Sequence, residues 1–183
     1  ILLTPHRFSP AYLDRQINGI FNVQFMPVRR DSNGLEALRW WRKACNAWCY
    51  YRLEEGKLGD QKYLDDWPTR FSGVHVLKHP GGAIGPWNVQ QYEFLKRKKG
   101  GEALRAQLHS GGPDFPVVFY HFHNFRMFAG GYARSLFYDI SDSAWNALYH
   151  PYASAVASAM KEMISKNPGL RRHGLSAEDE PVA

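Results

Sequence analysis

Two histidines near an apolar segment are the first candidates for chemistry. His121 and His123 flank Phe122 at the end of the apolar run 117–122, and ligand sites of α/β proteins form at such segment ends. We expect the two imidazoles to point to opposite faces of the segment and to bind one metal ion together only across a bend. One of them could be a ligand, whereas spacing alone favours an ordinary hydrogen-bonded histidine.

Three further polar residues each allow a structural and a chemical role. Asp60, followed by Gln61, stands just after a glycine at a predicted helix start. Asp60 could cap the first helical turn, or it could orient or deprotonate an acceptor hydroxyl. Asn22 lies in a predicted buried strand. Because an unpaired buried amide is costly, Asn22 must either fix the backbone or face a polar ligand.

Trp87 and Asn88 end a segment rich in glycine and proline, residues 79–88. A flat apolar ring beside an amide suits a sugar ring and its hydroxyls. Such an aromatic residue is equally common as a packing anchor, and the sequence leaves both roles open.

The elements that must position these residues alternate between strands and helices. Apolar and β-branched runs predict strands at 1–6, 19–29, 74–77 and 117–122. Caps and helical periodicity predict helices from Pro10, over 35–52, over 60–67 before Pro68, and over 143–166 with a break at 150–151. Between them lie a shaped loop over 79–88 and a polar insert over 94–113 that forms a small helix or a hairpin. This order predicts an α/β fold with a mixed sheet flanked by helices.

The composition indicates one folded domain with a basic surface. The chain has 183 residues, of which 44% are hydrophobic, and a net charge of +6, which suits an anionic partner such as a nucleotide, a phospholipid surface or nucleic acid. No apolar run is long enough to span a bilayer. Two cysteines, Cys45 and Cys49, indicate a reduced cytosolic protein rather than a disulfide framework. We expect one domain over 1–166 and a flexible polar tail over 167–183.

Four motifs follow one another along about residues 2–152. They are Phe21-Asn22-Val23-Gln24-Phe25, Gly59-Asp60-Gln61-Lys62-Tyr63-Leu64, Pro86-Trp87-Asn88 and Phe119-Tyr120-His121-Phe122-His123. Their order resembles the second half of an A-type nucleotide-diphospho-sugar glycosyltransferase, the class of glycogenin and the lipopolysaccharide galactosyltransferases. A group of bacterial enzymes associated with cell-surface polysaccharide is more closely similar. The resemblance implies the C-terminal, acceptor-side part of a Rossmann-like fold.

The resemblance also implies a role for each matching residue. Asp60 and Gln61 would be catalytic and line the sugar and acceptor pocket, and His121 would be a metal ligand. Substrate binding would fall to the other polar and aromatic positions of the motifs, which are Asn22, Gln24, Trp87, Asn88 and His123. A divalent metal, Mn or Mg, would neutralise the leaving nucleoside diphosphate. The family's Asp-x-Asp motif does not occur, so the other metal ligands are expected before Ile1.

These roles predict a hexosyltransferase that moves a sugar from a nucleotide-diphospho-sugar to a saccharide or lipid-linked acceptor. As a C-terminal part, the chain could be inactive alone. We expect a bacterial cytoplasmic protein with possible peripheral contact at the inner membrane and no nucleic-acid partner. The alternative is a basic, non-enzymatic module that binds carbohydrate or nucleic acid through Lys96–Lys99 and exposed aromatic residues.

Overall fold

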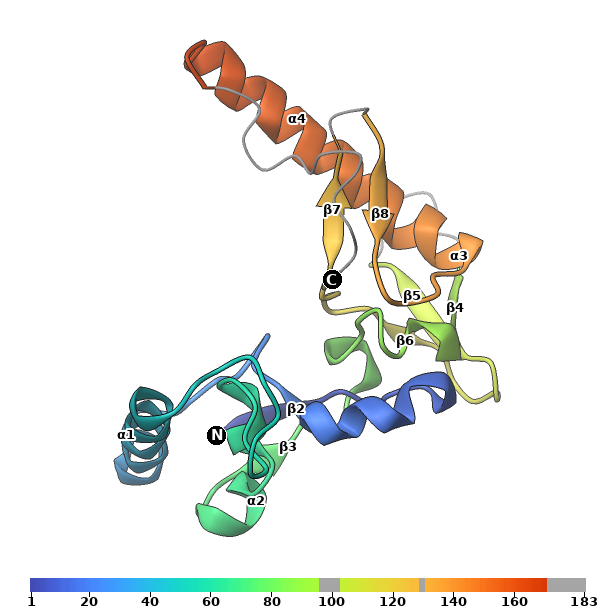
Figure 1. Cartoon of the computed structure of the whole chain (residues 1–183). Helices are drawn as coiled ribbons and strands as arrows, with labels where there is room; N and C mark the ends of the chain where they lie inside the picture. Colours follow the sequence, from blue (N-terminus) through green and yellow to red (C-terminus); the bar gives the residue numbers. More distant parts are fainter. Residues whose placement is uncertain (96–102, 129–130, 171–183) are drawn as a thin grey trace.

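The computed structural model describes residues 1–95, 103–128 and 131–170, which form a mixed α/β structure (Figure 1). The predicted α/β class is confirmed. The strands do not join into one sheet, however, and instead form three small sheets. Figure 1 shows two groups of elements, with α1, α2 and β1–β3 in one and β4–β8, α3 and α4 in the other. The basic run Lys96–Lys99 lies outside the described residues.

The first sheet is mixed and has the strand order β2-β1-β3. Its strands are β1 (Leu2–Pro5), β2 (Phe21–Asn22) and β3 (His75–Val76). β1 pairs antiparallel with β2, where Thr4 lies opposite Asn22, and parallel with β3. Strands are therefore confirmed at the first and third predicted positions.

The strand predicted over 19–29 is mostly wrong, because only β2 is extended and paired. After Asn22 the chain turns, and the side-chain oxygen of Asn22 accepts a hydrogen bond from the Gln24 amide at 2.6 Å. The Thr4 hydroxyl donates to the Phe25 carbonyl at 2.7 Å. These bonds between side chains and backbone take the place of a longer ladder.

Helix α1 (Ser32–Ala47) is the longest element of the first group. Its first turn is capped by Asp31, whose carboxylate accepts from the Gly34 amide at 2.9 Å. The helix begins three residues before the predicted 35–52 and ends earlier, since Trp48 is extended. Cys49 therefore lies beyond the helix and is exposed, whereas burial raises the pKa of Cys45 to about 11.

The helix predicted over 60–67 is split into η2 (Gln61–Leu64), a 3-10 turn, and α2 (Trp67–Arg70). Pro68 was expected to end a helix, and this is wrong. It lies in the first turn of α2, where the missing N–H removes no helical hydrogen bond. Leu64 and Trp67 are fully buried and pack with Leu3, Phe21 and Ala37 in the core of the first group.

A 3-10 helix, η1 (Pro10–Asn18), begins at the predicted proline and belongs to neither group. Ser9 is extended at its N-cap, but its hydroxyl makes no capping hydrogen bond. The helix exposes Leu13 and Ile17. In Figure 1 it lies between the two groups of elements.

The second group is built on two antiparallel sheets. The larger contains β4 (Tyr92–Leu95), β5 (Arg105–Leu108) and β6 (Phe115–Pro116), and the smaller contains β7 (Phe125–Met127) and β8 (Ala133–Ser135). Because β4 and β5 pair antiparallel, the described parts of the polar insert 94–113 take the hairpin arrangement. Tyr92, Phe94 and Ala106 contribute to the second core.

The run 117–122 was predicted to be a buried strand, and this is wrong. It is irregular apart from one isolated parallel bridge between Tyr120 and Ile84. Its backbone amides pair with the loop 79–88, since Val118 donates to the Gly81 carbonyl and His121 to the Ile84 carbonyl. The loop, which begins with η3 (Pro80–Gly82) and is followed by η4 (Val89–Gln91), is almost wholly buried from Gly81 onward.

The helical region at the end of the second group contains the predicted break. It consists of α3 (Asp142–Ala144), η5 (Trp145–Tyr149), which is a π-helical turn, and α4 (His150–Lys166). The π-turn stands directly before the first turn of α4, which contains Pro151, so the break is a local change of winding. The predicted tail 167–183 lies outside the described residues from 171 onward. No helix in the described part is long and apolar enough to cross a membrane.

Candidate functional site

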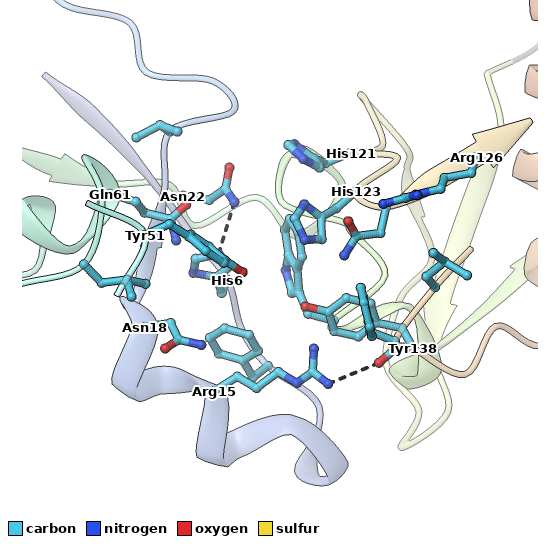
Figure 2. A pocket seen from close by; sticks show the side chains of 17 residues that line it. His6, Arg15, Asn18, Asn22, Tyr51, Gln61, His121, His123, Arg126 and Tyr138 are labelled. Atoms are coloured by element: carbon cyan, nitrogen blue, oxygen red, sulfur yellow. Dashed lines mark hydrogen bonds between the residues drawn. The ribbon is translucent and has the colours of Figure 1, made fainter. Parts of the chain in front are cut away.

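A cavity of about 790 Å³ lies between the two groups of elements. Figure 2 shows side chains from both groups directed toward it. Five of the eight residues predicted for the site line this cavity, namely Asn22, Gln61, Trp87, His121 and His123. The other three, Gln24, Asp60 and Asn88, are not among its lining residues.

His121 and His123 line the same cavity, which contradicts the prediction that they point to opposite faces. Residues two apart lie on one face even in a strand, so the spacing itself did not support opposite faces. The segment is moreover irregular and not a strand. The His123 amide donates to the His121 carbonyl at 2.9 Å, which closes a tight turn and brings the two ring centroids to 5.8 Å. Burial lowers the pKa of His121 to about 4, and it also lowers the pKa of His123. Both imidazoles are therefore neutral at pH 7, the form that can bind a metal ion.

His6 is a cavity residue that the sequence analysis missed. It follows β1 directly, and a polar residue at a strand end was the available signal. The Asn22 amide nitrogen lies 3.1 Å from His6 Nε2. Since Asn22 Oδ1 already accepts from the Gln24 amide, its nitrogen must be the donor, so Nε2 accepts and Nδ1 holds the proton. Asn22 thus fixes the backbone and orients His6 while it lines the cavity.

Trp87 combines the two roles that the sequence left open. It is only 2% exposed, and its ring meets His6 at 4.8 Å and His121 at 5.3 Å between centroids. It is therefore a packing anchor that forms part of the cavity wall and holds the two imidazoles in place.

Asn88 has a structural role in place of the predicted contact with substrate. Its side chain is fully buried, its nitrogen donates to the carbonyls of His6 at 2.6 Å and Ala83 at 2.8 Å, and its oxygen accepts from the Gly85 amide at 3.0 Å. These bonds use most of the capacity of the amide. Asn88 joins the end of β1 to the buried loop.

Asp60 and Gln24 lie away from the cavity lining. Asp60 is exposed and its side chain makes no capping bond, while its carbonyl accepts from the Trp41 indole at 2.9 Å. The side-chain amide of Gln24 is buried without a hydrogen-bond partner among the described residues. Of the predicted catalytic pair, only Gln61 reaches the cavity.

Several lining residues had no signal in the sequence. Arg15 and Asn18 come from η1, Arg126 comes from β7, and Tyr51 and Tyr138 come from loops. No carboxylate of the described residues lines the cavity. The lining therefore combines cationic, amide, imidazole and aromatic groups, a set that suits an anionic and hydroxyl-rich ligand.

The described residues fit the predicted metal ion only in part. His121 and His123 offer two neutral imidazoles to one cavity, but no group of three histidine, cysteine or acidic side chains in the described ranges could hold a metal. A divalent ion held here would need further oxygen ligands from its substrate or from elsewhere in the protein.

The buried His6 should make the stability of the protein depend on pH. Burial is the main cause that lowers its pKa from 6.5 to about 4, and the nearby carbonyls of Ile20 and Gly19 oppose this shift. Since the folded state resists protonation, stability is complete above pH 6.5 and falls as the pH drops toward 4. At pH 5 we expect His6 to account for a loss of about 2 kcal/mol relative to pH 7.5.

Urea unfolding at both pH values measures this loss. His6→Gln removes the titrating group, so the difference between the two pH values should be about 2 kcal/mol smaller than in wild type. His109→Gln changes an exposed histidine outside the cavity and is the control. An equal pH response in wild type and His6→Gln would contradict the expectation.

Comparison with known proteins gives two relatives and no family. The chain is 31% identical over 175 residues to the uncharacterized protein YfnD of Bacillus subtilis strain 168, a match that covers 92% of the chain and 53% of the relative. It is 35% identical over 124 residues to the uncharacterized protein YfnF of the same strain, which covers 64% of the chain and 38% of that relative. No family model and no solved structure matches. The chain is similar to two bacterial proteins, and it spans about half the length of YfnD and less of YfnF.

Proposed function

We propose that this chain is the acceptor-side part of an A-type glycosyltransferase that moves a hexose from a nucleotide-diphospho-sugar to an acceptor hydroxyl. The observation that carries the proposal is the convergence of Asn22, Gln61 and His121 on one cavity. They come from three segments that are distant in the sequence and that the resemblance implicated independently of any geometry. The proposal extends to a cytoplasmic protein of cell-surface polysaccharide synthesis with a lipid-linked or saccharide acceptor.

The lining residues have chemistry that suits such a reaction. The amides of Asn22 and Gln61 can exchange hydrogen bonds with sugar hydroxyls. The neutral His121 can bind a divalent ion, which would neutralise the charge of the leaving diphosphate. Asn22 and His121 stand on facing sides of the cavity in Figure 2, so a donor sugar and its diphosphate could lie between them.

Binding of UDP in the presence of Mn²⁺ tests the proposal. Isothermal calorimetry of the full-length parent protein should show that Mn²⁺ strengthens UDP binding and that His121→Ala reduces this gain at least about tenfold, as expected for a lost metal ligand or charge-assisted contact. His109→Ala, which removes an exposed histidine outside the cavity, is the matched control.

Two outcomes would count against this function. If UDP does not bind with or without Mn²⁺, the cavity is not a site for the leaving group of a UDP-sugar. If His121→Ala leaves the metal dependence unchanged, His121 has no part in holding the metal.

A further inference from the structure

Arg15 places a cation in the cavity, and no carboxylate of the described residues pairs with it. Its guanidinium carbon lies 4.4 Å from the centroid of the Tyr138 ring and 5.1 Å from that of Tyr12. One of its nitrogens donates to the Phe137 carbonyl at 3.2 Å. Arg15 forms no ion pair with a described residue, and no described carboxylate lines the cavity.

The contacts of Arg15 fix its orientation before any ligand binds. Tyr138 and Phe137 hold the guanidinium from the second group of elements, although Arg15 itself belongs to η1. A guanidinium has five N–H donors, and the hydrogen bond from Arg15 to the Phe137 carbonyl uses one of them. The charge of Arg15 also contributes to the lowered pKa of His123, after the larger effect of burial, so the two side chains are close enough to interact.

Figure 2 shows Arg15 at the end of the cavity that is remote from His121 and Asn22. The proposed function assigns the donor sugar and its diphosphate to the His121 end. A ligand group beside Arg15 would therefore belong to the other substrate. Carboxylates and phosphates are the groups that a held guanidinium binds best, because two parallel N–H bonds of its planar fork match two of their oxygens.

We propose that Arg15 binds an anionic group, a phosphate or a carboxylate, on the acceptor. This inference rests on the proposed function, since the donor end of the cavity defines the acceptor end. The acceptor would then be an acidic or phosphorylated saccharide, or a lipid-linked sugar whose phosphate reaches Arg15. An unpaired cation in a partly buried place is stabilised by such a ligand.

NMR titrations of the protein with three sugars test the proposal. Glucose 6-phosphate carries a phosphate, glucuronate carries a carboxylate, and glucose is the neutral reference. In wild type, at least one of the charged sugars should bind about tenfold more tightly than glucose, and the charged sugar that binds more tightly identifies the source of the anion. Arg15→Gln should remove this advantage, because a hydrogen bond to a charged group contributes a factor of this size.

Two further variants separate charge from folding. Arg39→Gln removes the same charge from the exposed face of α1, away from the cavity, and should bind all three sugars as wild type does. Arg15→Lys keeps the charge without the planar fork and should retain a measurable preference for the charged sugars. If Arg15→Gln and Arg39→Gln bind the charged sugars equally well, or if wild type shows no preference for them, the proposal is overturned.

Saturation with UDP and Mn²⁺ distinguishes the acceptor from the donor. If the anion belongs to the acceptor, the preference for charged sugars that depends on Arg15 remains in the UDP-bound protein. If UDP displaces the charged sugar competitively, Arg15 serves the donor phosphates and the acceptor assignment is wrong. If UDP does not bind while the Arg15-dependent preference persists, the glycosyltransferase function fails and the anion site itself stands.

Discussion

Replacing Asn88 with alanine is expected to lower the free energy of unfolding by about 3–5 kcal/mol. The substitution leaves three buried backbone groups without their partner, the carbonyls of His6 and Ala83 and the amide of Gly85. Each such group costs about 1–3 kcal/mol when it is buried and unpaired, and partial relaxation of the loop reduces the sum. Urea unfolding followed by circular dichroism measures the effect.

Asn88→Asp tests whether hydrogen bonding, rather than side-chain volume, causes the loss. Aspartate keeps the shape, but it turns a carboxylate oxygen toward the carbonyls of His6 and Ala83, which are both acceptors. We expect it to be at least as destabilising as alanine. Asn46→Ala, an exposed change on α1, should stay within about 0.5 kcal/mol of wild type. A stable Asn88→Asp protein would contradict the structural role of this amide.

The bonds of Asn88 also show why the sequence could not reveal that its side chain pairs with buried backbone groups. An amide beside a tryptophan has the same composition whether it faces a sugar or a buried carbonyl. The role of the amide is decided by the position of His6, which lies 82 residues earlier and supplies one of the two carbonyl acceptors. The residues next to Asn88 in the sequence do not indicate such a distant hydrogen-bond partner.

Helix starts that depend only on neighbouring residues were predicted well. Asp31 with the following apolar periodicity fixes the start of α1 within three residues, because the cap and the amphipathic face both lie in that segment. The run 117–122 shows the opposite case. Its apolar composition is that of a strand, yet the partners of its amides are the carbonyls of a loop, at Gly81 and Ile84, and not those of another strand.

The residues of the candidate site also fall into two classes, those that the sequence could identify and those that depend on distant contacts. Residues that belong to motifs, such as Asn22, Gln61 and His121, could be named through the resemblance to a known family. Arg15 could not, because its place in the cavity depends on Tyr138 and Phe137, more than 120 residues later. The cavity arises where the two groups of elements meet, so its composition is a property of tertiary packing.

Gly81 lies in the buried loop beside the segment that leads to His121, and it is the second position where a small change should have a large effect. A Cβ atom added at Gly81 would lie 2.0 Å from the Pro116 carbonyl oxygen and 3.0 Å from its carbon. Both are backbone atoms, so a side-chain rotation cannot relieve the contact. The Gly81 carbonyl also accepts from the amides of Val118 and Phe119, at 2.9 and 3.3 Å, and separation of the two segments would weaken these bonds.

We therefore expect Gly81→Ala to lower the free energy of unfolding by at least about 3 kcal/mol. Gly169→Ala is the matched control, because the nearest atom to its added Cβ is 3.4 Å away and lies in a side chain. A Gly81→Ala protein that still folds must move the segment leading to His121. Its imidazole should then gain contact with water, and NMR titration should show its pKa rising from about 4 toward 6.5. Wild-type stability, or an unmoved His121 pKa in a destabilised variant, would show that the loop does not position the cavity histidines.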